Sequence, residues 1–169
     1  MANKKPDRAP LRKIKLLLLD VDGVMTDGGI YFTEGGDELK KFNIHDGYGI
    51  MKLRKMGLTI GIITGRISKL VTRRAQELGI SEIHQNLENK LAAYKAIKEK
   101  LNLSDSEIAY IGDDEPDIPV LKSVGFSACP ANAVLAVRKL ADYVCTCRGG
   151  EGAVREVIDL ILESQSHAR

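Results

Sequence analysis

The chain has 169 residues, of which 44% are hydrophobic and 28% are charged, and its formal net charge at pH 7 is +2. This length and composition are typical of one globular domain with a core of its own. The small net charge argues against a nucleic-acid partner, and no apolar run reaches the length required for membrane insertion. We therefore expect a cytoplasmic protein that partners neither nucleic acid nor membrane.

A strand is the first predicted element, after a basic, proline-containing leader at 1–13 that is expected to be flexible. The apolar run at 15–20 is typical of a strand buried on both faces, and it leads into Asp20 and Asp22. The carboxyl end of such a strand is where α/β folds bind ligands. Residues two apart on a strand point to the same side, so these carboxylates repel each other unless a divalent cation or a proton intervenes. Alone, the motif also fits an ordinary acidic turn.

A β-hairpin is predicted at about 29–42, directly after this acidic turn. Its two arms, 30–32 and 38–42, flank a glycine-rich stretch at 33–37. Because the hairpin follows the turn at once, it is expected to stand near the same edge of the sheet. The residues that remain before the next strand have room for one helix.

Strands and helices alternate through the rest of the chain. Strands are predicted at 58–64, 83–85, 108–112, 125–129 and 143–146, and amphipathic helices at 67–78, 89–101 and 153–162. This alternation indicates a parallel sheet that is covered by helices on both faces. We expect one domain at 14–163 and a mobile polar tail at 164–169.

Three later segments bring polar side chains to the same edge of the sheet. Thr64 and Arg66 follow the strand at 58–64 and offer a hydroxyl and a guanidinium that can bind a phosphoryl group, although a helix N-cap also explains them. Lys90 stands in the first turn of a helix, against the preference for acids there. Four acids at 113–117 are costly to place together without a cation, and their oxygen donors favour Mg²⁺; a solvated acidic turn is the alternative.

The order of these motifs resembles that of the haloacid dehalogenase superfamily of phosphotransferases. The resemblance covers 15–162 and rests on Asp-x-Asp-Gly at 20–23, Thr-Gly-Arg at 64–66, Lys90, and Gly-Asp-Asp-x-x-Asp at 112–117. It implies an α/β fold of three layers around a Rossmann-like parallel sheet. The small β-hairpin would be inserted where other members of the superfamily carry a cap domain.

Segments at 42–50 and 148–156 extend the resemblance to the branch that hydrolyses 3-deoxy-D-manno-octulosonate 8-phosphate in lipopolysaccharide precursor synthesis. The resemblance implies a Mg²⁺-dependent phosphatase whose small-molecule substrate is a phosphorylated keto sugar acid. A phosphatase of a nine-carbon keto sugar acid 9-phosphate, or a broad sugar phosphatase, is the first alternative. A receiver-like phosphoacceptor module is more remote, because no candidate acceptor Asp is visible on a middle strand.

The resemblance also implies roles for the motif residues. Asp20 would be the nucleophile that forms an aspartyl-phosphate, and Asp22 would be the general acid and base. Thr64 and Lys90 complete the catalytic set by binding phosphoryl oxygens. The implied metal ligands are Asp20, Asp22 through its backbone carbonyl, and Asp113. Asp114 and Asp117 would lie next to these ligands. The implied substrate-binding residues are Asp22, Asn43, Ile44, His45, Asp46, Gly47, Arg66, Arg74 and Lys90.

Two positions depart from the family pattern. The family often carries Arg where this chain has His45 and Met51. One of these side chains can titrate and the other is apolar, so the contacts to the sugar carboxylate are expected to differ. The phosphatase chemistry itself does not depend on these positions.

The spacing of the motifs leaves no room for a cap domain over the site. An open site selects substrates poorly and leaves its charges in water. We therefore expect a neighbouring subunit to supply the lid, in a homo-oligomer with the hairpins at its interface, and the resemblance implies a tetramer. Arg66, Arg74 and the segment 148–152 are expected to act across that interface.

Overall fold

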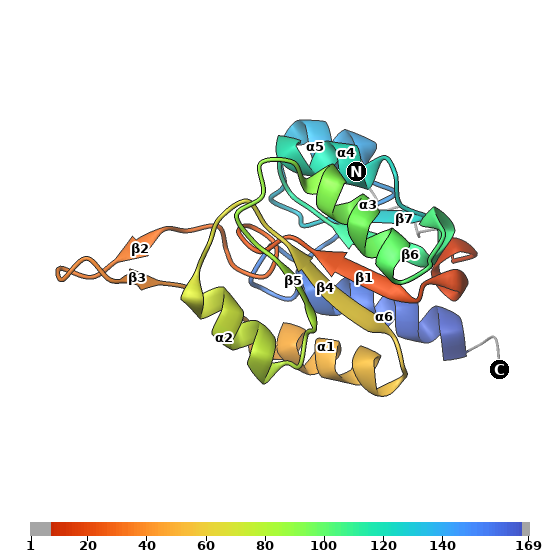
Figure 1. Cartoon of the computed structure of the whole chain (residues 1–169), viewed down its shortest axis with the longest axis horizontal. Coiled ribbons are helices and arrows are strands. Elements are labelled where there is room, and N and C mark those ends of the chain that lie inside the picture. Colours follow the sequence, from red (N-terminus) through yellow and green to blue (C-terminus); the bar gives the residue numbers. More distant parts are fainter. Residues whose placement is uncertain (1–7, 167–169) are drawn as a thin grey trace.

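A six-stranded parallel sheet forms the centre of the structure, a computed structural model that describes residues 8–166 (Figure 1). The strands are β1 (Leu16–Leu19), β4 (Thr59–Ile63), β5 (Glu82–His84), β6 (Ile108–Ile111), β7 (Phe126–Cys129) and β8 (Tyr143–Val144), in the order β5-β4-β1-β6-β7-β8. The chain passes from β1 to β4 on one side and later returns to β6 on the other. The carboxyl end of β1 therefore lies at the switch point where α/β sheets bind ligands.

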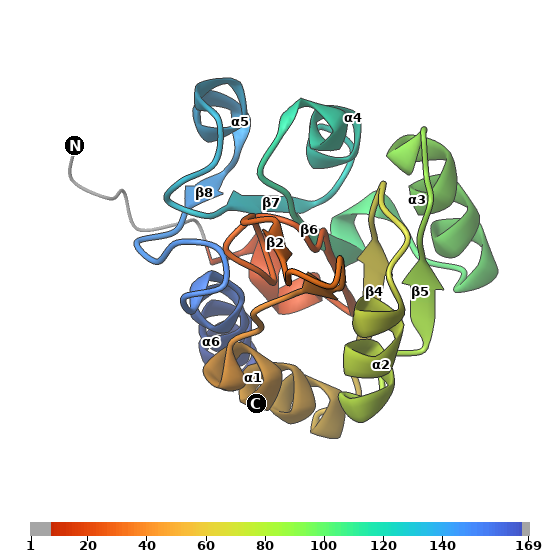
Figure 2. The same ribbon diagram turned by 90° about the vertical axis from the view of Figure 1, so that its left-hand side faces the viewer.

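Helices cover both faces of this sheet and give three layers (Figure 2). On one face lie α1 (Ile44–Lys55), α2 (Lys69–Glu77) and α6 (Ala153–Ser166), and on the other lie α3 (Lys90–Lys100), α4 (Ile118–Leu121) and α5 (Leu135–Leu140). The strand β1 consists of four leucines that alternate between the two cores, Leu17 and Leu19 in one, Leu16 and Leu18 in the other. The predicted three-layer α/β fold is confirmed.

The predicted hairpin is also present and stands away from the body of the protein (Figure 1). It consists of β2 (Tyr31–Phe32) and β3 (Glu38–Leu39), which pair antiparallel. In its turn, the backbone N–H of Thr33 donates to the carbonyl of Asp37 at 2.9 Å. Between β1 and β4 the described residues contain only this hairpin and one helix, α1, so the hairpin takes the place of a cap domain.

The bounds of helix α1 do not follow from the sequence pattern, because Gly47 and Gly49 interrupt its apolar periodicity. Both glycines let other helices approach closely. A Cβ at Gly47 would lie 2.4 Å from Nη2 of Arg74, and one at Gly49 would lie 2.8 Å from Cδ of Arg155. The helix is thus specified by its packing against α2 and α6. The helices α4 and α5, of four and six residues, are too short for a periodic signal.

The described structure differs from the predicted domain at both ends. Within the expected leader, residues Pro10–Lys13 form a 3-10 helix, η1, in which Leu11 is completely buried. Within the expected tail, α6 continues to Ser166, and the Gln165 amide donates to the carbonyl of Ile14 at 2.8 Å. Residues 1–7 and 167–169 lie outside the described part. None of the helices described between residues 8 and 166 is long and apolar enough to cross a membrane.

Candidate active site

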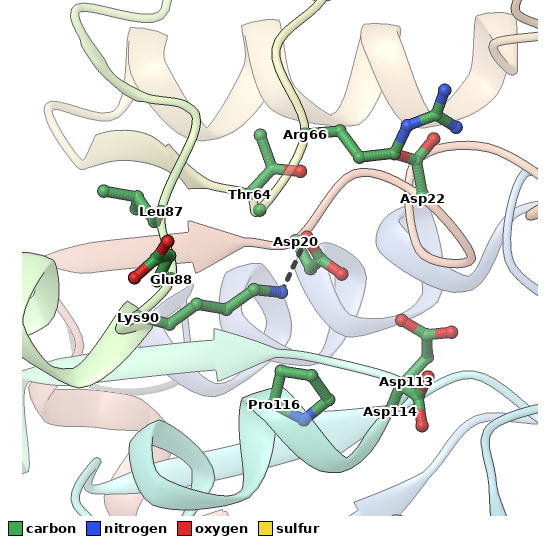
Figure 3. Close-up of a pocket in the computed structure, with 11 residues that line it drawn as sticks. Asp20, Asp22, Thr64, Arg66, Leu87, Glu88, Lys90, Asp113, Asp114 and Pro116 are labelled. Carbon is green, nitrogen blue, oxygen red and sulfur yellow. Dashed lines mark ion pairs between the residues drawn. The ribbon is translucent and has the colours of Figure 1, made fainter.

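A cavity of about 290 Å³ opens at the carboxyl ends of β1, β4 and β6 (Figure 3). Its lining residues are Asp20, Asp22, Thr64, Gly65, Arg66, Leu87, Glu88, Lys90, Asp113, Asp114 and Pro116. All four sequence motifs contribute to this list, although they are separated by up to about a hundred residues along the chain. The parallel sheet brings them together because each motif follows a strand or begins the next helix.

Lys90 is the central cation of this cavity. Its Nζ lies 3.0 Å from Oδ1 of Asp20 and 2.6 Å from Oδ1 of Asp117, and Figure 3 shows it pointing toward Asp20. Burial lowers the pKa of Lys90, but the charges of the two carboxylates outweigh this effect and raise it above its usual value. A lysine at the start of α3 therefore stays protonated, with both carboxylates as its counter-ions.

Asp117 is a fully buried carboxylate that contacts Lys90 and the loop at 113–117. Its Oδ1 also accepts a hydrogen bond from the Tyr110 hydroxyl at 2.5 Å, and its Oδ2 accepts from the backbone N–H groups of Asp113 and Asp114 at 2.9 and 3.1 Å. Asp117 lies within reach of a shared cation with Asp20 and Asp113, yet both of its oxygens already have donors. Its carboxylate is thus committed to holding Lys90 and the loop at 113–117.

Asp20 and Asp113 have the environment of metal ligands. Oδ1 of Asp113 is buried without a hydrogen-bond partner in the described structure. Burial and the charges of Asp20 and Asp117 raise the pKa of Asp113 to about 8, and burial, then the charge of Asp117, raise that of Asp20 to about 6. A buried carboxylate oxygen without a donor, close to another carboxylate, fits a cation. Because the donors are oxygens, the residues fit Mg²⁺.

The structure requires a glycine at position 23, the last residue of the first motif. Its φ of +88° favours glycine, and a Cβ at this position would lie 2.1 Å from Oδ2 of Asp113. Any other residue here would displace the carboxylate. The glycine lets the loop after β1 pass directly beside Asp113, so the first and last motifs meet.

Thr64 and Arg66 approach the cavity from the end of β4. The backbone N–H of Thr64 donates to the carbonyl of His84 at 2.9 Å, which continues the pairing of β4 with β5 and fixes this residue. Its side chain lines the same cavity as Asp20, where a hydroxyl can donate to a phosphoryl oxygen. Arg66 reaches toward the hairpin, and its Nη2 donates to Oε1 of Glu38 at 2.7 Å.

The other predicted substrate-binding residues do not line this cavity. Asn43 caps α1 and accepts from the N–H of His45 at 2.7 Å, while Ile44 is exposed. Buried Asp46 accepts from the N–H of Arg155 at 2.8 Å and so joins α1 to α6; burial raises its pKa to about 6.

His45, Gly47 and Arg74 also lie outside the cavity that contains Asp20. His45 borders a separate hollow with Tyr143 and Arg155. Gly47 packs against Arg74, whose guanidinium lies 6.0 Å from the ring of Phe42. The substrate contacts predicted for these residues stay predictions.

Lys40 is a member of the site that sequence reasoning missed. Its Nζ bonds Oδ1 of Asp22 although it comes from the base of the hairpin. In the sequence it is one of two adjacent lysines within the predicted arm at 38–42, a pattern that is typical of a solvated hairpin. The spacing of Glu38 and Lys40, two apart and hence on one side of an extended segment, was the available signal.

Mg²⁺ is expected to raise the Tm of the protein more at pH 8 than at pH 6. Because the pKa values of Asp113 and Asp20 are raised to about 8 and about 6, the metal-free protein binds more protons folded than unfolded. Its free energy of unfolding therefore falls between about pH 4 and about pH 8. Mg²⁺ competes with these protons, so its binding strengthens as pH rises. Thermal unfolding with and without MgCl₂ measures this, and an equal shift at both pH values would contradict the ligand assignment.

Known proteins resemble this chain over most of its length. The family model of the haloacid dehalogenase-like hydrolases matches residues 72–158. The 3-deoxy-D-manno-octulosonate 8-phosphate phosphatase of Escherichia coli K12 is 47% identical over 157 residues, which cover 93% of this chain and 84% of the relative. The corresponding phosphatase of Salmonella typhi is 48% identical over 90% of this chain and 81% of its own.

Solved structures agree with these relatives. The phosphatase of this name from Yersinia pestis superimposes with a TM-score of 0.92 and 46% identity, covering 94% of this chain and 86% of its own. The phosphatase of this name from Moraxella catarrhalis was solved in complex with magnesium ion, phosphate ion and KDO. It superimposes with a TM-score of 0.92 and 43% identity, covering 95% of this chain and 92% of its own. Sequence motifs, fold and relatives lead to one conclusion: the chain belongs to the haloacid dehalogenase-like hydrolases.

Proposed function

We propose that this chain is a Mg²⁺-dependent phosphatase that hydrolyses 3-deoxy-D-manno-octulosonate 8-phosphate to the free keto sugar acid and phosphate, in lipopolysaccharide precursor synthesis. The observation that carries the chemistry is the cavity in which Asp20 meets Lys90, Thr64 and Asp113. The choice of substrate is supported by relatives of that name at 47% identity and by the Moraxella catarrhalis structure with magnesium, phosphate and KDO.

The reaction proceeds in two displacements at phosphorus. A carboxylate oxygen of Asp20 forms a bond to phosphorus while the bond from phosphorus to the sugar oxygen breaks, and Asp22 gives that oxygen a proton. A water molecule then attacks the aspartyl-phosphate, Asp22 takes a proton from this water, and phosphate leaves with Asp20 regenerated. The nucleophile and the proton carrier are thus two residues of one short loop.

The remaining groups stabilise the charge of the transferred phosphoryl group. Lys90 supplies a buried ammonium that Asp117 holds in place, and Thr64 supplies a hydroxyl at the end of β4. Prearranged donors of this kind contribute most of the rate in phosphoryl transfer. Mg²⁺, bound by Asp20, Asp113 and the backbone carbonyl of Asp22, would add further neutralisation of the phosphoryl oxygens.

Metal removal tests this function. The protein should release phosphate from 3-deoxy-D-manno-octulosonate 8-phosphate with Mg²⁺ present, lose this activity after treatment with a chelator, and recover it when MgCl₂ is added in excess. Turnover that is unchanged by the chelator would contradict a Mg²⁺-dependent mechanism. Failure to release phosphate in either condition would contradict the choice of substrate.

We further propose that the protein acts as a homo-oligomer, with a tetramer as the expected form. The hairpin and the segment before it expose Ile30, Phe32 and Leu39 by 61%, 67% and 54%, and a cluster of exposed apolar side chains is typical of an interface. A hairpin from a neighbouring subunit would cover the open cavity, and Arg66, Arg74 and the segment 148–152 would act across the same interface. A cytoplasmic location stays a prediction from the sequence.

Replacing Phe32 by Ser is expected to shift the sedimentation of the protein toward the 18.5 kDa monomer and to raise the KM for the sugar phosphate. The matched control is Leu135→Ser, since Leu135 is exposed to a similar degree, 62%, on helix α5. Sedimentation velocity and steady-state kinetics measure both effects. A wild-type protein that sediments as a fully active monomer would contradict the proposed assembly.

A further inference from the structure

Lys40 buries its ammonium group at the base of the hairpin, just after β3. Its side chain is only 2% exposed, and its Nζ is hydrogen-bonded to Oδ1 of Asp22, with Oε1 of Glu38 at 3.8 Å. An ammonium that has lost its water shell is stable only beside such partners. Conversely, the Asp22 side chain loses rotational freedom when one of its oxygens is held by a buried donor.

These groups belong to a chain of alternating charges that joins three segments. Asp22 comes from the loop after β1, Lys40 and Glu38 come from the hairpin, and Arg66 comes from the loop after β4. Oε1 of Glu38 accepts from Nη2 of Arg66 at 2.7 Å. Asp22 and Arg66 both line the cavity, and Figure 3 shows them above Asp20, away from Lys90. The hairpin base is therefore ionically attached to two loops at the cavity mouth, the loop after β1 and the loop after β4.

The neighbouring lysine has a different environment. The side chain of Lys41 is 59% exposed, and its Nζ lies 3.7 Å from Oδ2 of Asp27, a residue that does not line the cavity. An exposed pair of this kind contributes little. Two adjacent lysines thus separate into one that bonds the candidate general acid and one that remains at the surface.

We propose that Lys40 is a positioning residue of the reaction. By bonding Oδ1 of Asp22, it directs the other carboxyl oxygen toward the leaving oxygen of the substrate, and it makes this orientation depend on the hairpin. A proton donor must lie within hydrogen-bond reach of the atom it protonates, and small displacements of reacting groups cost much of the rate. The inference rests on the proposed function, because that function assigns proton transfer to Asp22.

The test compares two leaving groups in the variant Lys40→Met. A sugar alkoxide requires a proton as it leaves, whereas 4-nitrophenolate does not. The first displacement is measured as the single-turnover rate at which the leaving group is released, because the second displacement uses Asp22 with both substrates. This rate is expected to fall about 10- to 100-fold with 3-deoxy-D-manno-octulosonate 8-phosphate and by less than about threefold with 4-nitrophenyl phosphate. Lys40→Arg should recover part of the loss, since it keeps a cation and a donor. Lys41→Met is the matched control and should change neither rate.

A double-mutant cycle with Asp22→Asn locates the effect. If Lys40 acts through Asp22, then Lys40→Met causes no further loss in the Asp22→Asn background. Equal losses on both leaving groups, or a full further loss in that background, would overturn the inference. These outcomes leave the proposed function intact, because the wild-type protein still hydrolyses the sugar phosphate.

Amide hydrogen exchange gives a second test that needs no turnover. Exchange at 21–28 and 29–42 should be faster in Lys40→Met than in the wild type or in Lys41→Met, since the hairpin loses its attachment to the Asp22 loop. Unchanged exchange in both segments would overturn the inference whatever the substrate. Absence of turnover in the wild type, by contrast, would count against the proposed function alone.

Discussion

Asp20→Asn is expected to lower phosphate release by about 10⁴-fold or more, because an amide cannot replace the carboxylate that attacks phosphorus. The variant should keep its fold. Asparagine has the same shape, and Lys90 retains its bond to Asp117 at 2.6 Å. Removing a buried charge that is opposed by Asp117 also relieves repulsion, since burial and this neighbour already raise the pKa of Asp20 to about 6. The Tm without metal should therefore stay close to that of the wild type.

The matched control for this variant is Asp27→Asn. Asp27 lies in the same loop, but its carboxylate accepts from the N–H of Gly29 at 3.0 Å and from the Tyr31 hydroxyl at 2.8 Å, outside the cavity. The same chemical change there should leave phosphate release near the wild-type rate. An Asp20→Asn protein that retains a tenth or more of the wild-type rate would show that another group attacks phosphorus.

Lys90→Met is expected to impair both catalysis and stability. Loss of the ammonium removes a donor to the phosphoryl oxygens and should lower kcat by about 10²- to 10³-fold. It also leaves the carboxylates of Asp20 and Asp117 buried without their cation, which destabilises a protein by about 3–5 kcal/mol. The destabilisation should be larger at pH 8 than at pH 5. The pKa of Asp20, already raised to about 6, rises further without Lys90, so at the lower pH this carboxyl is protonated and carries no charge.

Urea unfolding at the two pH values measures this prediction. Lys98→Met is the control on the same helix, because Lys98 pairs with Asp105 at 2.7 Å on the protein surface and such pairs are worth about 0–1 kcal/mol. If Lys90→Met were as stable and as active as Lys98→Met, the ammonium would have neither the structural nor the catalytic role assigned to it.

The sequence predicted those features that depend on local pattern. Leu16–Leu19 is apolar throughout because both faces of β1 are covered, so the strand and its position in the sheet are visible in the residues themselves. The acids that follow β1 and β6 are expected to meet, since parallel strands end at one edge. The proximity of Asp20 and Asp113 therefore follows from the sequence pattern alone.

Features that depend on packing between distant segments were not visible in this way. Asp46 and Arg155 are 109 residues apart and meet only because α1 lies against α6. Lys40 and Lys41 have the same side chain and adjacent positions, yet one is buried by the Asp22 loop and the other is not. The resemblance implied a place for Asp117 beside the metal ligands; its bonds to Lys90 and Tyr110 show why the chain needs an acid there.

The most direct test of the whole account compares three substrates in the presence of Mg²⁺. We predict that kcat/KM for 3-deoxy-D-manno-octulosonate 8-phosphate exceeds that for a nine-carbon keto sugar acid 9-phosphate by about 10- to 100-fold, and that 4-nitrophenyl phosphate is poorer than either. This order would support both the phosphatase chemistry and the eight-carbon substrate. A preference for the nine-carbon compound, or equal kcat/KM values for all three, would contradict the proposed substrate. The phosphatase mechanism would then be the part that remains.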